Sequence, residues 1–174
     1  LLINVVDDPC IEYLPEFYTV ASEDDRKEFV EAIRCKLRKL DNDVKCEWWN
    51  RWLRKYLVNR FQNVPKPLTD SEYTSIMYWI PELKAVYPEI VDMICVHGMP
   101  KSVPHMFMYQ LEESNIVKTY PHETIKLIIE LLESDTEFEY FGEEIKSIYS
   151  NAEDLSAQEK HAFREACLKR HIKL

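Results

Sequence analysis

Glycine is almost absent from this chain of 174 residues: only Gly98 and Gly142 occur, where average usage predicts about a dozen. Phosphate-binding loops, dinucleotide-binding turns and nucleophile elbows all need glycine, because the backbone must turn tightly or approach a ligand closely. The motifs G-x-G-x-x-G, G-x-x-x-x-G-K-[ST] and G-x-S-x-G therefore cannot occur. The composition excludes the common nucleotide-binding enzymes and favours rigid elements with few flexible hinges.

Apolar residues recur at helical spacing along most of the chain, and no segment gives a convincing strand pattern. We expect helices over 23–40, 44–62, 69–80, 88–97 and 138–150, with further helices starting near Pro104, Pro121 and Ser156. Ser22, Thr69 and Ser156 have the pattern of helix N-caps. The predicted fold class is all-α, either an irregular bundle or a HEAT-like stack, with about seven to nine helices.

A faint internal repeat is compatible with the stack, but it has two copies where such repeats normally need about three, so both architectures stay open. Met77-Tyr78 and Tyr87-Pro88 recur as Met108-Tyr109 and Tyr120-Pro121, displaced by about 31–33 residues, which lies in the range of helix-pair repeats. Each Tyr-Pro pair is expected to open an amphipathic helix.

The length fits a single helical domain over residues 1–174, with sub-halves 1–66 and 67–174 as the alternative. Because the chain begins without methionine, we expect it to be a fragment of a larger protein. No apolar run approaches the roughly 18 residues of a membrane span, and the five scattered cysteines suit reduced thiols. A cytoplasmic protein without membrane contact is the expectation.

The net charge of −9 is unevenly distributed. Residues 1–25 hold seven acids and no Lys or Arg, residues 26–66 hold twelve bases against five acids, and residues 67–160 hold eighteen acids against six bases. The basic block either neutralises acidic segments within the fold or forms a patch for an anionic partner. The excess of negative charge elsewhere opposes nucleic-acid binding.

The helix over 44–62 combines aromatic and basic residues. Its tryptophans, Trp48, Trp49 and Trp52, are expected in the core, because aromatic residues at helical spacing usually form a buried face. The basic residues are the candidate partner-binding set, either at the surface or paired with acidic segments. This set is Arg51, Arg54, Lys55, Arg60 and Lys66.

Catalytic and metal sites have weaker support. Cys167 and His171 share a helix face, and Cys95, His97 and His105 form a second candidate group of ligands. Neither group has the paired spacing of a zinc site. Adjacent acids such as Glu143 and Glu144 diverge by about 100° on a helix and do not face each other. We therefore expect no metal, no cofactor and no catalytic residue in this chain.

One region resembles a known domain type. The matching residues are Trp52-Leu53-Arg54-Lys55-Tyr56, Asn59-Arg60, Val64-Pro65-Lys66-Pro67-Leu68, Glu72, Met77, Trp79, Tyr87-Pro88-Glu89 and Val91. Over about residues 45–95 the chain resembles an uncharacterised bacterial helical domain that follows sirtuin-like domains in large proteins associated with phage defence. The resemblance implies an NAD-consuming or other effector domain upstream, and it assigns no functional residue here.

Three functional hypotheses follow from the sequence. The leading one is a non-enzymatic, cytoplasmic interaction, sensing or regulatory module attached to an effector. Its protein-binding surface would be a groove beside residues 51–66 or the acidic face of residues 110–145. The second is nucleic-acid binding through the basic set. The third is a helical hydrolase with a cysteine or metal centre.

Overall fold

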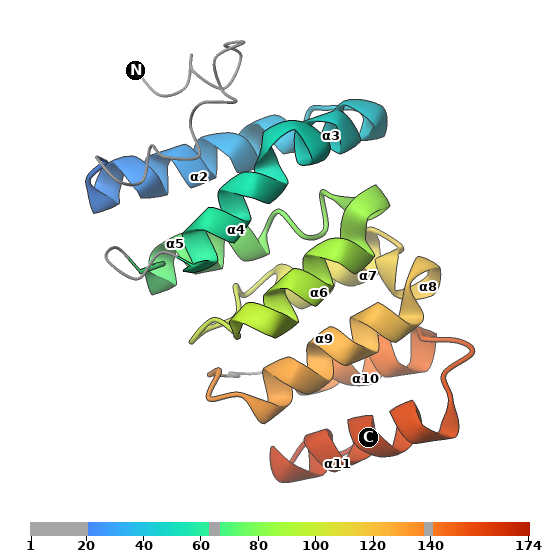
Figure 1. The fold of residues 1–174 in the computed structure, drawn as a ribbon. Coiled ribbons are helices and arrows are strands. Elements are labelled where there is room, and N and C mark those ends of the chain that lie inside the picture. The colour runs from blue at the N-terminus through green and yellow to red at the C-terminus, as the bar shows by residue number, and fades with distance from the viewer. Residues whose placement is uncertain (1–20, 63–66, 138–140) are drawn as a thin grey trace. The chain divides into compact units, whose positions relative to one another are not determined.

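The computed structural model describes residues 21–62, 67–137 and 141–174, and these form helices joined by short connections (Figure 1). The described residues contain nine helices, when the consecutive elements α3 (Asn42–Trp48), η3 (Trp49–Leu53) and α4 (Arg54–Gln62) are counted as one continuous helix. Their only β-type pairing is an isolated bridge between Ser102 and Glu137. The all-α prediction is confirmed.

The described part of the chain divides into two compact units, which meet in sequence between Val86 and Tyr87. The alternative division predicted from the sequence lies after residue 66. The difference arises because the helix that follows residue 69 packs on the first helix, α2, and shares a buried ion cluster with the preceding helices.

The first unit contains one long helix between two shorter ones. Ser22 caps the first of them through its side chain, as predicted, with Asp25 completing a capping box. The second helix begins at Asn42, two residues earlier than predicted, with Asp41 at its N-cap position. The elements are α2 (Glu23–Leu37), α3 (Asn42–Trp48), the π-helical turn η3 (Trp49–Leu53), α4 (Arg54–Gln62), α5 (Asp70–Met77) and the 3-10 turn η4 (Lys84–Val86).

Aromatic side chains form the core of this unit. The Phe29 and Tyr56 ring centroids lie 5.3 Å apart, and those of Tyr56 and Trp79 lie 6.2 Å apart. The indole N–H of Trp79 donates to the carbonyl oxygen of Val30 at 3.1 Å. Of the predicted core tryptophans, Trp49 and Trp52 are buried, whereas Trp48 is only half-buried and lies against Trp52.

The second unit has two layers of helices. Helix α9 packs against both α6 and α11, while α10 packs against α7 and α8. Figure 1 shows α6, α9 and α11 side by side. The elements are α6 (Tyr87–His97), α7 (Phe107–Glu113), α8 (Ile116–Thr119), α9 (Pro121–Glu133), α10 (Gly142–Asn151) and α11 (Ala157–Lys169).

The two Tyr-Pro pairs open α6 and α9, as predicted, and they also join these helices. The rings of Tyr87 and Tyr120 stack with centroids 5.6 Å apart. The Tyr87 hydroxyl forms a 3.1 Å hydrogen bond with the side-chain oxygen of Thr124, which itself donates to the Tyr120 carbonyl. Burial raises the pKa of Tyr87, so its hydroxyl keeps its proton for this contact.

Some predicted boundaries differ from the observed ones. The helix expected from Pro104 begins at Phe107, because the Pro104 carbonyl first accepts the Phe107 amide in a turn. The sequence pattern did not predict helix α8. Asn115, in the left-handed conformation with φ of 62°, separates it from α7. The first residues of the helix predicted over 138–150 lie outside the described residues, and α10 begins at Gly142.

Candidate functional site

The predicted basic set is not one surface, because Arg60 belongs to the core. Its guanidinium Nη2 lies 3.0 and 3.1 Å from the two carboxylate oxygens of Glu72, and both side chains have no solvent exposure. Arg26 from α2 adds a third charge, with its Nε 3.3 Å from the same carboxylate. Arg60 is therefore unavailable to a partner, which corrects its assignment to a binding surface.

Three of the other predicted residues are at the surface of the long helix. Arg51, Arg54 and Lys55 are exposed, and Arg51 lies 3.9 Å from Glu47 one turn earlier. Lys66 lies outside the described residues.

Other bases of the 26–66 block are paired within the first unit. Arg34 contacts Glu31 at 3.1 Å and stacks over the Tyr78 ring, while Lys45 contacts Glu82 at 3.3 Å. These pairs favour the reading in which the basic block is neutralised inside the fold.

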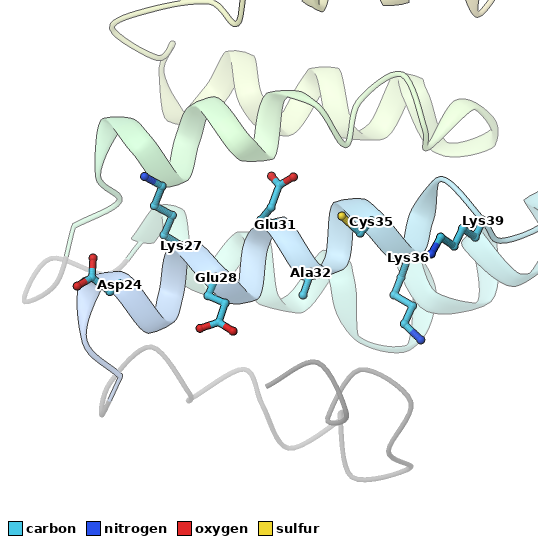
Figure 2. A pocket seen from close by; sticks show the side chains of 8 residues that line it. All are labelled: Asp24, Lys27, Glu28, Glu31, Ala32, Cys35, Lys36 and Lys39. Carbon is cyan, nitrogen blue, oxygen red and sulfur yellow. The ribbon is translucent and has the colours of Figure 1, made fainter. Parts of the chain in front are cut away.

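A hollow of about 500 Å³ runs along the outer side of α2 (Figure 2). Long charged side chains such as Lys27, Glu31 and Lys36 border it, with Ala32 and Cys35 between them. Every described lining residue comes from α2 or from Lys39 just after it. The described residues thus supply a single wall, which has mixed charge and no convergent polar groups.

The second unit contains a cleft of about 470 Å³ across α6, α9 and α11, which we call the acidic cleft. Its apolar lining comes from Ile125, Ile129 and Ala162, which are buried or half-buried. Four carboxylates and one lysine border it, so the formal net charge is −3 with His122 neutral. The complete lining is Asp92, His122, Glu123, Ile125, Lys126, Ile129, Glu130, Gln158, Glu159 and Ala162.

Two ion pairs cross the acidic cleft and join α9 to its neighbours. Lys126 Nζ lies 2.7 Å from Asp92 on α6, and His122 Nδ1 lies 2.8 Å from Glu159 on α11. The Ser156 hydroxyl and backbone amide hydrogen-bond to Glu159 and, with a smaller effect from His122, lower its pKa to about 2. The same contact with Glu159 raises the pKa of His122.

Glu123 and Glu130 form no direct ion pair with any described residue. At longer range, the charge of Glu123 adds to the effect of Glu159 in raising the pKa of His122. The charge of Glu130 adds to the effect of Asp92 in raising the pKa of Lys126. The two glutamates are seven residues apart on α9 and share one face of the helix. Val96 lies one turn after Asp92 on α6 and is 80% exposed. The acidic cleft therefore offers two carboxylates without a direct ion-pair partner among the described residues, and an exposed aliphatic side chain lies on α6 one turn from Asp92.

Sequence reasoning identified only part of this cleft. The predicted acidic face of residues 110–145 includes Glu123 and Glu130, but Asp92 and Glu159 come from outside that range. They join the cleft because α6 and α11 both pack on α9. In the sequence, the spacing of Glu123, Lys126 and Glu130 at i, i+3 and i+7 indicates that these three charged side chains share one face of a helix.

The cysteines and histidines singled out in the sequence do not converge. Among the described residues, no group of three or more His, Cys, Asp or Glu side chains is placed so that it could hold a metal ion. Burial raises the pKa of Cys95 and of Cys167 to about 11. Both thiols are therefore protonated at neutral pH and weakly nucleophilic.

Comparison with known proteins found no matching family model, no matching curated protein and no matching solved structure. Within the part of the chain that the structure describes, every helix is too short or too polar to span a bilayer.

Proposed function

We propose that this chain is a non-catalytic helical module that binds a protein partner and so regulates an attached effector domain in the cytoplasm. The acidic cleft is the observation that supports this proposal. It combines an apolar lining with two carboxylates that lack a direct ion-pair partner, and the exposed side chain of Val96 lies one turn beyond Asp92, as is typical of protein-binding grooves. The effector domain, and its setting in bacterial phage defence, come from the sequence resemblance alone.

Glu159 and Lys126, one partner from each ion pair of the acidic cleft, suit binding better than acid–base catalysis. A general acid or base works best with a pKa near the operating pH. Here the pKa of Glu159 is lowered to about 2 and that of Lys126 is raised by its hydrogen bond to Asp92. Both groups keep their charge at neutral pH, so they can orient a ligand but exchange protons poorly.

A capture experiment with two charge-reversal variants tests the proposed function. The whole chain is immobilised and exposed to extract from its native host, and retained proteins are identified by quantitative mass spectrometry. The variants are Glu123→Lys/Glu130→Lys in the acidic cleft and Arg54→Glu/Lys55→Glu on the long helix.

We expect an identifiable protein to be retained by the wild type and the Arg54/Lys55 variant, and lost by the cleft variant. Retained nucleic acid that depends on Arg54 and Lys55 would instead support the alternative function. If no retained protein depends on the cleft, or if the purified chain cleaves NAD, the proposal is wrong.

A further inference from the structure

Given the proposed function, on which this inference rests, the residues that line the acidic cleft specify the kind of protein segment that it binds. The geometry points to a short peptide segment of a partner protein that carries lysine or arginine next to aliphatic residues. Its basic side chains contact Glu123 and Glu130, and its aliphatic side chains contact Ile129 and Ala162.

The negative charge of the acidic cleft determines that its partner is positively charged. With a formal net charge of −3, the acidic cleft repels phosphate groups and acidic peptides and attracts cations. Its donor groups are already engaged, because Lys126 is paired with Asp92 and His122 is hydrogen-bonded to Glu159. A bound anion would have to break these pairs, whereas a bound cation leaves them intact and reaches the two unpaired carboxylates.

Spacing along α9 determines the pattern of basic residues. Seven residues of α-helix advance about 10 Å, so Glu123 and Glu130 lie about that far apart along the axis. A peptide in the polyproline II conformation advances about 3.1 Å per residue and has three residues per turn, so side chains three residues apart share one face and lie about 9 Å apart. The expected pattern is therefore two basic residues separated by two others, Lys-x-x-Lys or its arginine equivalent.

The apolar lining determines the residues between the basic ones. Ile125 and Ile129 are one turn apart on α9 and line the same cleft as Ala162 of α11. Val96 adds a strongly exposed aliphatic side chain beyond Asp92 on α6. Aliphatic residues in the peptide would remove this surface from water, at about 25 cal/mol for each Å² buried. A purely basic peptide gains nothing from these contacts.

Fluorescence anisotropy with defined synthetic peptides tests the inference on the whole chain. The probe is a fluorescein-labelled peptide with a Lys-Leu-Leu-Lys centre. Two companion peptides replace either both lysines by glutamate or both leucines by alanine. The cleft variant Glu123→Lys/Glu130→Lys is compared with Glu143→Lys/Glu153→Lys, which changes the net charge equally at exposed positions of the same unit.

We expect saturable binding of the probe to the wild type, and a loss of about tenfold or more in affinity for the cleft variant. The Glu143/Glu153 variant should retain most of the affinity, and both companion peptides should bind more weakly. Circular dichroism confirms that each variant is folded.

Equal losses in the two variants would show general attraction to an acidic protein and overturn the inference, as would failure of the wild type to bind the probe. Either result leaves the capture experiment to decide the proposed function separately, because a partner of other chemistry would still be lost by the cleft variant there.

Discussion

At the scale of single residues, the Glu72 carboxylate takes part both in a helix cap and in a buried ion cluster. It accepts the Thr69 backbone amide at 3.2 Å and so completes the capping box of α5. The same carboxylate neutralises Arg26 and Arg60, which come from two other helices. One side chain therefore joins three helices of the first unit.

We expect Glu72→Ala to lower the free energy of unfolding by about 3–5 kcal/mol, because it leaves two buried arginines without their counterion. Glu82→Ala is the matched control, since Glu82 is 27% exposed and pairs only with Lys45, and it should cost less than about 1 kcal/mol. Urea denaturation followed by circular dichroism measures both. Similar losses would show that the buried cluster contributes no more than a surface pair.

The His122–Glu159 pair predicts a pH dependence of stability. Its hydrogen bond and charge raise the pKa of His122 above the ordinary 6.5, so the folded chain holds this proton more tightly than the unfolded chain. The stabilisation is complete below about pH 6.5 and disappears as the pH rises through the raised pKa. Glu159, with its pKa lowered to about 2, stays ionised in this range.

We therefore expect His122→Ala to lower the urea midpoint at about pH 5.5 and to have little effect at about pH 9. His161→Ala is the control, because His161 on the same layer of helices is exposed and forms no ion pair among the described residues. An unchanged difference between wild type and His122→Ala across this range would contradict the prediction.

At the scale of elements, local backbone chemistry sets where helices begin and end. Ser22, Thr69 and Ser156 each accept the backbone amide three residues later. In each of these capping boxes, the acidic side chain at that later position accepts the backbone amide of the capping residue in return. Gly98 ends α6 with φ of 101°, a conformation that L side chains rarely adopt, and its amide donates to the Ile94 carbonyl.

The two glycines provide a matched test of this ending. A Cβ at either position would meet no atom within 4 Å, and only Gly98 has positive φ. Gly98→Ala should lower the free energy of unfolding by about 1 kcal/mol through backbone strain. Gly142→Ala, at the start of α10, should leave it unchanged or raise it slightly. Thermal denaturation compares the two, and equal effects would argue against strain at Gly98.

At the scale of the whole molecule, each of the two units encloses its own core. Ile33 of α2 is fully buried in the first unit, and Ile128 of α9 is fully buried in the second. Replacing either by alanine removes the same group and should cost about 2–5 kcal/mol.

We expect Ile33→Ala to increase amide hydrogen exchange mainly within residues 21–86, and Ile128→Ala mainly within residues 87–174, as measured by mass spectrometry. Increases spread equally over both units in both variants would instead support a single cooperative domain over residues 1–174, as predicted from the sequence.

The sequence by itself determined the helical class, the three helix N-caps and the two Tyr-Pro helix starts. These features depend on hydrogen bonds and dihedral angles within a few residues, so the local residue types are sufficient to predict them.

Only the tertiary structure decided which charges are buried and which stay in solvent. Arg60 is as basic in sequence as Arg54, but its helix face meets Glu72 of α5, so one becomes core and the other surface. Asp92 and Glu159 are 67 positions apart, and they border one cleft because both neighbouring helices pack on α9. Helix packing depends on complementary shape over whole faces, and this information is not present in any short stretch of sequence.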